Sequence, residues 1–85
     1  MDTRVAIIGI IVEDYNSVDA LNEILHENRN VIIGRMGIPY RAKNISVMSI
    51  AVDADTDTIN AISGKIGKLS GVSAKTAISG TCICD

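Results

Sequence analysis

The stretch Val5–Val12 constrains this chain more than any other. It is an unbroken apolar run, rich in β-branched residues, and it is closed by Glu13 and Asp14. Side chains of a strand alternate between its two faces, so both faces of this strand are apolar. A strand of this kind has to be covered on both sides, and this requirement shapes the rest of the fold.

The composition indicates one small domain with an aliphatic core. The chain has 85 residues, and a chain this short buries only roughly 60% of its unfolded surface. Yet 47% of the residues are hydrophobic, while Phe and Trp are absent. This apolar content exceeds what one small core needs, so we expect the domain to associate with copies of itself.

Charge and targeting patterns argue against several classes of partner. Eight basic and ten acidic residues give a net charge of −2, whereas unaided nucleic-acid binding usually needs a basic face. No apolar run reaches transmembrane length, and Asp2 stands where a secretory signal needs a positive charge. We therefore expect a cytoplasmic protein that binds neither nucleic acid directly nor a membrane.

Hydrophobic periodicity predicts four strands and two helices in the order β-α-β-β-α-β. The helices are expected at about 18–27 and 56–69, and the strands at about 4–13, 31–36, 45–53 and 72–79. Residues 37–44 are expected to form a turn or long hairpin loop, because Pro39 lacks a ladder donor. This is the order of an α+β ferredoxin-like fold, with both helices on one face of a four-stranded antiparallel sheet. The domain would span residues 1–79, followed by a tail at 80–85.

The other face of this predicted sheet has no cover within the chain. Apolar patches beyond a few hundred Å² usually mark an interface, and covering them gains about 25 cal/mol per Å². We therefore expect a homo-oligomer with sheets packed face to face or joined edge to edge. The alternative is an open sheet that is merely apolar.

Two segments have the residue types of a ligand site. In Gly34–Arg41, glycines let backbone approach a ligand and Arg35 and Arg41 suit an anion; the alternative, favoured by the residues alone, is a hairpin with solvated charges. In Glu13–Ser17, free N–H groups at a helix start suit an anion. There the favoured alternative is a capping turn with Asn16 or Ser17 as the N-cap.

The remaining reactive side chains point to no enzyme. His26, the only histidine, is expected on the polar side of the first helix as a surface residue. Cys82 and Cys84 suit a soft metal or a redox pair, or form an ordinary reduced tail. With no nucleophile–base pair, metal cluster or phosphate loop in the sequence, we expect a non-enzymatic protein without a cofactor or metal.

Five stretches together form a recognisable pattern: Arg4–Ile10, Val31–Tyr40, Ile45–Asp53, Ser63–Gly67 and Gly71–Val72. In these stretches the chain resembles a family of small proteins identified as regulators of the iron-only hydrogenase system. That family is similar to the ACT group of ligand-sensing domains and to the C-terminal domain of nickel-responsive repressors. The resemblance implies a dimer or tetramer that holds an effector at a subunit interface. The His and Cys ligands of the nickel repressors have no matching set here, and a protein partner would be needed for any transcriptional role.

On this interpretation a small anionic or zwitterionic effector binds between subunits, through the backbone of both segments and the side chains of Arg35 and Tyr40. The candidate ligand-binding residues are Glu13, Asp14, Asn16, Ser17, Gly34, Arg35, Met36, Gly37 and Tyr40. The alternative function is a metal- or cluster-handling accessory protein in hydrogenase maturation that acts through Cys82 and Cys84.

Overall fold

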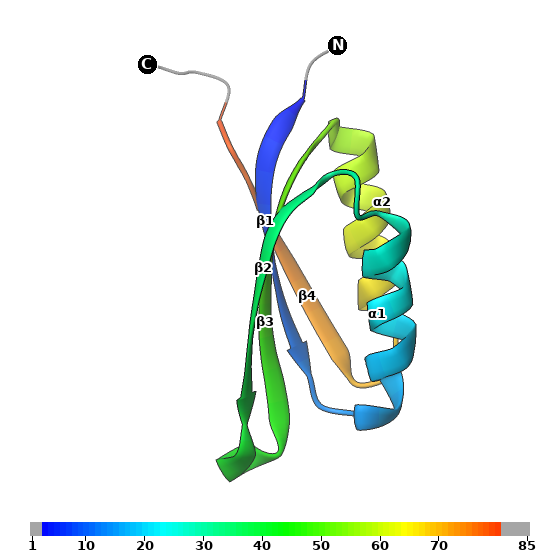
Figure 1. Cartoon of the computed structure of the whole chain (residues 1–85), viewed down its shortest axis with the longest axis vertical. Coiled ribbons are helices and arrows are strands. Elements are labelled where there is room, and N and C mark those ends of the chain that lie inside the picture. Colours follow the sequence, from blue (N-terminus) through cyan, green and yellow to red (C-terminus); the bar gives the residue numbers. More distant parts are fainter. Residues whose placement is uncertain (1–2, 81–85) are drawn as a thin grey trace.

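The computed structural model describes residues 3–80 and has the predicted order of elements (Figure 1). The strands are β1 (Arg4–Val12), β2 (Ile32–Tyr40), β3 (Ile45–Ala54) and β4 (Val72–Ile78). The helices are α1 (Val18–Glu27) and α2 (Thr56–Gly67), with short 3₁₀ helices η1 (Tyr15–Ser17) and η2 (Arg41–Lys43). No helix of the described part is long and apolar enough to cross a membrane.

The four strands form one antiparallel sheet in the order β2-β3-β1-β4. Both helices lie on the same side of this sheet (Figure 1), so the ferredoxin-like α+β fold predicted from the sequence is confirmed. The apolar run forms the inner strand β1, which pairs with β3 on one side and β4 on the other. One face of β1 is therefore covered by the helices, and the other lies on the side of the sheet without helices (Figure 1).

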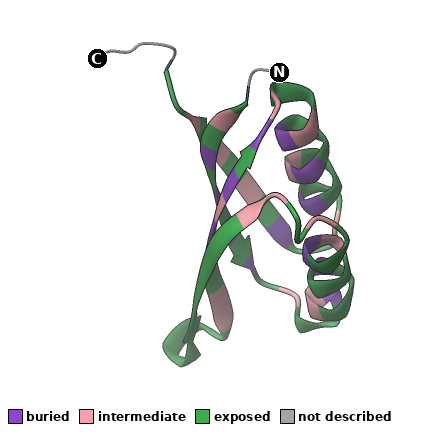
Figure 2. Ribbon diagram, turned by 45° about the horizontal axis from the view of Figure 1, so that its top comes forward, coloured by how far each residue is buried: buried purple, intermediate pink, exposed green. Residues whose placement is uncertain are grey.

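The core lies between the sheet and the helices (Figure 2). From β1, alternate residues from Ala6 to Val12 point into it, each at most 3% exposed. The helix stripes supply the other side of the core: Leu21, Leu25, Ile59, Ile62 and Ile66. Each large aliphatic side chain contributes about 1.5–3 kcal/mol when fully buried, so this layer holds the helices on one face.

Local hydrogen bonds fix both helix starts, although not always through the expected residue. Asp55 caps α2, accepting a hydrogen bond from the Thr58 amide at 3.0 Å. Ser17 occupies the N-cap position of α1, but its hydroxyl donates instead to the Ser70 carbonyl at 2.6 Å. Asp14 caps the short η1 by accepting from the Asn16 amide at 3.0 Å.

The predicted hairpin loop at 37–44 is wrong in its first half. β2 continues to Tyr40, with Pro39 paired opposite Ser46. Because β2 is an edge strand, alternate N–H groups face away from the sheet, and a proline there need not break the ladder. Only η2 and Asn44, which has a left-handed φ of 56°, form the turn. Every other element end matches its predicted position or lies within two residues of it.

A tight contact joins the turn before β4 to the turn after β1. Gly71 has a φ of +67°, and a Cβ at this position would lie 2.5 Å from the Asp14 Cβ. We predict that Gly71→Ala lowers the free energy of unfolding by at least about 2 kcal/mol, through left-handed strain and overpacking. Urea denaturation measures the change.

Gly64→Ala is the matched control, because nothing lies within 4 Å of the Cβ that it would add to α2. This variant should gain up to about 1 kcal/mol through higher helix propensity. If Gly71→Ala were as stable as the wild type, the close packing of these turns would be wrong.

The cap at Asp55 makes stability depend on pH. Hydrogen bonds with the Thr58 side chain and backbone hold the pKa of the Asp55 carboxyl below its ordinary value of 3.8. A lowered folded-state pKa stabilises the fold above the unfolded pKa, and this contribution is lost as the pH falls through the folded value. We predict that Asp55→Ala is less stable than the wild type at pH 7 and that the difference shrinks below about pH 4.

Urea titrations at a series of pH values test this cap. Asp57→Ala removes a carboxylate from the same first turn of α2 and controls for the loss of charge alone. A stability difference for Asp55→Ala that stays constant into acid would contradict the charged cap.

Candidate functional site

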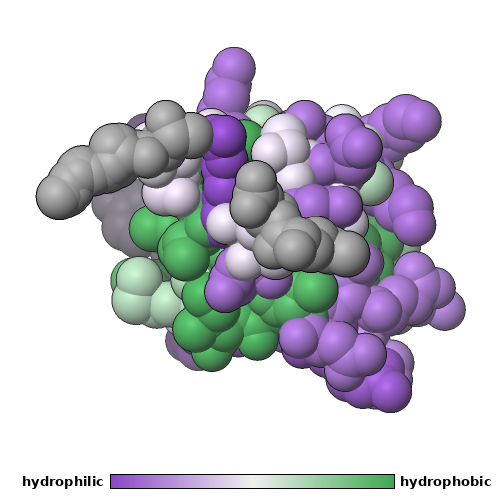
Figure 3. Space-filling view, turned by 90° about the horizontal axis from the view of Figure 1, so that it is seen from above, coloured by the Kyte–Doolittle hydropathy of each residue, from purple (hydrophilic) through white to green (hydrophobic). Residues whose placement is uncertain are grey.

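The face of the sheet opposite the helices, called here the open face, is exposed and apolar. Nine large hydrophobic side chains are exposed among the described residues, and strand register places seven of them on this face. They are Val5, Ile7, Ile11, Met36, Ile38, Tyr40 and Val47. Figure 3 shows hydrophobic residues gathered on the sheet side and hydrophilic residues over the helices. The covering that β1 requires is therefore supplied on one face only.

A shallow hollow of about 380 Å³ lies near the middle of the open face. Gly9 forms part of it, because only backbone lies near this position and no side chain fills it. Gly9 pairs with Ser49 of β3 and with Lys75 of β4. The centre of the open face is therefore lined by the small residues Gly9 and Ser49 together with Lys75, while larger apolar side chains lie on β2 and toward the ends of β1.

The predicted segment Glu13–Ser17 is tied into the fold by contacts with the turn before β4. The Glu13 amide donates to the Gly71 carbonyl at 2.7 Å, and Asp14 packs against Gly71. Ser17 is 7% exposed and bonds to Ser70. These contacts give the segment a structural role. Gly34 lies farther along the sheet, opposite Ala51, which pairs with Ile7 of β1.

The residues predicted on β2 divide between the two faces of the sheet. Arg35 pairs with the buried Ile50 and so lies on the helix side, where its Nη2 donates to the Asn22 Oδ1 at 3.4 Å. Met36 and Tyr40 lie on the open face. Tyr40 lines a hollow of about 180 Å³ that also includes Tyr15 of η1. One subunit therefore does not bring the Arg35 and Tyr40 side chains to the same site.

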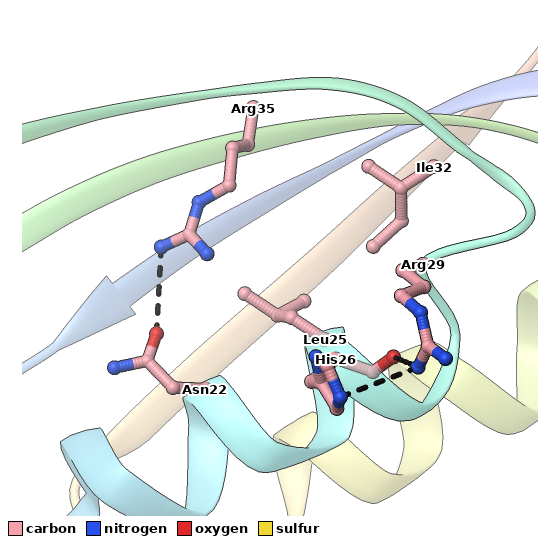
Figure 4. A pocket seen from close by; sticks show the side chains of 6 residues that line it. All are labelled: Asn22, Leu25, His26, Arg29, Ile32 and Arg35. Atoms are coloured by element: carbon pink, nitrogen blue, oxygen red, sulfur yellow. Dashed lines mark hydrogen bonds between the residues drawn. The ribbon is translucent and has the colours of Figure 1, made fainter.

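Arg35 instead belongs to a pocket between α1 and β2, called here the α1–β2 pocket (Figure 4). Its volume is about 470 Å³, and it is lined by Asn22, Leu25, His26, Arg29, Ile32 and Arg35. The Arg29 Nη1 donates to the His26 carbonyl at 2.9 Å and lies 3.3 Å from the His26 ring Nε2. This carbonyl is near the end of α1, where a cation complements the helix dipole.

Five of the six residues that line this pocket were not predicted as site residues, and three of these five are polar. Asn22, His26 and Arg29 follow one another at helical spacing, so they share one side of the helix and the turn after it. That spacing was the feature of the sequence from which this polar cluster could have been predicted. His26 is exposed, as predicted, but it lies beside an arginine.

Metal binding is not supported by the described residues. Within residues 3–80 no group of three or more His, Cys, Asp or Glu side chains is placed to hold a metal ion. The predicted role of Cys82 and Cys84 lies outside the residues that the structure describes.

Comparison with known proteins identifies the family. Residues 4–76 match the sequence model of the TM1266-like family, described as "Iron-only hydrogenase system regulator" and marked there as a proposed role. The chain belongs to this family. The solved structure of the uncharacterized protein TM1266 from Thermotoga maritima is 36% identical and superposes with a TM-score of 0.87. The match covers 91% of this chain and 98% of that one.

No curated protein matches the sequence. The family predicted from the sequence stretches is thus confirmed by the family model and by the TM1266 structure.

We predict that Ser17→Ala lowers the free energy of unfolding by about 0.5–1.5 kcal/mol. It removes the hydroxyl of the buried Ser17 and with it the part-buried hydrogen bond to the Ser70 carbonyl. Chemical denaturation measures the loss. Asn16→Ala, at an exposed neighbouring side chain, serves as the control and should change stability less. A Ser17→Ala variant as stable as the wild type would contradict a structural role for this turn.

Proposed function

We propose that the protein is a non-enzymatic, oligomeric regulator of the iron-only hydrogenase system. In this proposal its subunits associate through the open face, and a small anionic or zwitterionic effector changes how they pack. The family to which the chain belongs supports the regulatory role. The observation that carries the proposal is the open face itself, an apolar surface on a protein whose helix side is polar.

The energetics of the open face favour association. Its exposed large side chains are each about half covered already, with exposures from 41% for Val47 to 62% for Met36. Covering the rest of each gains roughly 1 kcal/mol. Summed over the face, this gain is comparable to the lower estimates of the cost of bringing two proteins together. A second copy of the chain is therefore a suitable cover.

The distribution of large and small side chains suggests how two copies would fit. On the open face, the edge strand β2 carries Met36, Ile38 and Tyr40, whereas the opposite edge strand β4 carries Ser73, Lys75 and Ala77. A twofold axis parallel to the strands would place β2 of one copy over β4 of the other. Ile38 would then face the small Ser73 of the other copy, Met36 would lie over the methylene stem of Lys75, and Ile11 of each copy would face Val47 of its partner.

The edge strand also links effector binding to subunit packing. Arg35 lies on the helix side of β2, while the next residue, Met36, lies on the open face. An anion that pairs with Arg35 would therefore act on the same strand that forms the proposed interface. A ligand shifts such an equilibrium only as far as its affinity differs between the two packings. The output would pass to a protein partner.

We predict that the wild-type protein sediments as a species larger than the 9.0 kDa monomer and that Ile7→Lys reduces it to a monomer. Ile7 is 51% exposed on β1 in the open face, and a buried, unpaired charge there would be costly. Sedimentation velocity at micromolar concentration makes the measurement.

Ala61→Lys is the control, because Ala61 is exposed on α2, away from the open face. This variant should keep the wild-type assembly. Sedimentation of the wild type as a monomer, or an unchanged assembly for Ile7→Lys, would contradict association through the open face.

A further inference from the structure

We infer that the α1–β2 pocket binds a small dicarboxylate, with one carboxylate held by Arg35 and the other by Arg29. A dicarboxylate would be the effector of the proposed function, and its effect on subunit packing rests on that proposal. Binding itself needs only the residues of one subunit, so it can be tested apart from association.

The charge of the pocket selects an anion. Its lining contains two arginines and no Asp or Glu, although the whole chain has a net charge of −2. The hydrogen-bond partner of Arg35 is the neutral amide oxygen of Asn22, at the long distance of 3.4 Å. A carboxylate would replace this weak contact with a charge-assisted and bidentate one.

The spacing of the two guanidinium groups favours a ligand with two charges. Arg35 reaches α1 at Asn22, and Arg29 reaches it at the His26 carbonyl. These positions are four residues apart, or about 6 Å along a helix. The two arginines lie on either side of Leu25 in the view of Figure 4. A short dicarboxylate spans such a separation, whereas a single phosphate would engage only one of the arginines fully.

The surface between the arginines is apolar and suits a carbon chain. Leu25 is 3% exposed and belongs to the core, and Ile32 is partly buried against it. Methylene groups of a dicarboxylate would lie over these side chains and displace water from the exposed part of Ile32. The volume of about 470 Å³ is within the usual range of small-molecule pockets. Apolar contact and two charges together distinguish this ligand from inorganic anions.

Arg29 is already held in position for this role. Its hydrogen bond to the His26 carbonyl uses one N–H of Nη1, and a guanidinium has five N–H donors. Nη1 also lies 3.3 Å from the His26 ring Nε2, so the donors on Nε and Nη2 are the ones that can bind a carboxylate while the contacts with α1 are kept. Less side-chain freedom is then lost on binding than for an unrestrained arginine.

Amide NMR titration with succinate and glutarate tests the inference on the full chain at low ionic strength. Butyrate, with one carboxylate, and inorganic phosphate serve as ligand controls at matched ionic strength. We expect saturable shifts at residues of the pocket with a dicarboxylate, and at least about tenfold weaker binding of butyrate and of phosphate.

Substitutions of single arginines test whether the dicarboxylate binds in the α1–β2 pocket. Arg29→Gln and Arg35→Gln should each weaken dicarboxylate binding at least about tenfold, while Arg41→Gln, on η2 and outside the pocket lining, should leave it unchanged. The inference is overturned if neither dicarboxylate binds the wild type, or if phosphate or butyrate binds as tightly as the dicarboxylates. It is also overturned if Arg41→Gln weakens dicarboxylate binding as much as the pocket variants do. Because Ile7→Lys leaves the pocket residues in place, binding by that monomeric variant separates failure of this site from failure of the proposed association.

Discussion

The unequal covering of β1 is the constraint on which the rest of the structure depends. Alternate residues of this strand are almost fully buried under the helices, whereas Val5, Ile7 and Ile11 on the other face are 47%, 51% and 42% exposed. An inner strand with two apolar faces contributes its full hydrophobic energy only when both are removed from water. The helix layer satisfies half of this requirement, and the open face is the unsatisfied half on which our functional proposal rests.

The edge strand β2 joins the two surfaces with proposed roles. Because its side chains alternate between faces, Arg35 reaches α1 while its neighbours form part of the apolar face. As an edge strand it pairs with β3 alone, so its position is restrained on one side only. In our proposal this freedom lets a ligand in the α1–β2 pocket affect subunit packing.

Features set by local pattern were predictable from the sequence, and features set by distant contacts were not. The run Val18–Glu27 was predicted with its observed ends, because an apolar stripe and flanking polar turns define it. The face on which Arg35 lies depends on the extent of β2 and on an irregularity between Ile32 and Gly34, which residue types alone do not specify. Likewise, Ser17 finds its partner 53 residues away, so the sequence showed a capping residue but not the bond that it makes. The candidate site was predicted to form between subunits, and within one subunit its residues lie on both faces of the sheet.

Solvent paramagnetic relaxation of methyl groups tests most directly whether the open face is covered by a second copy of the chain. A soluble paramagnetic agent relaxes every methyl group that water can reach, and Ala61 on the outer side of α2 provides an exposed reference. Our account predicts that the methyl groups of Ile7, Ile11 and Met36 are shielded at micromolar concentration and become accessible on dilution. Methyl groups on these three residues that relax as strongly as that of Ala61 at every concentration would show an open face in contact with water, and would contradict the account.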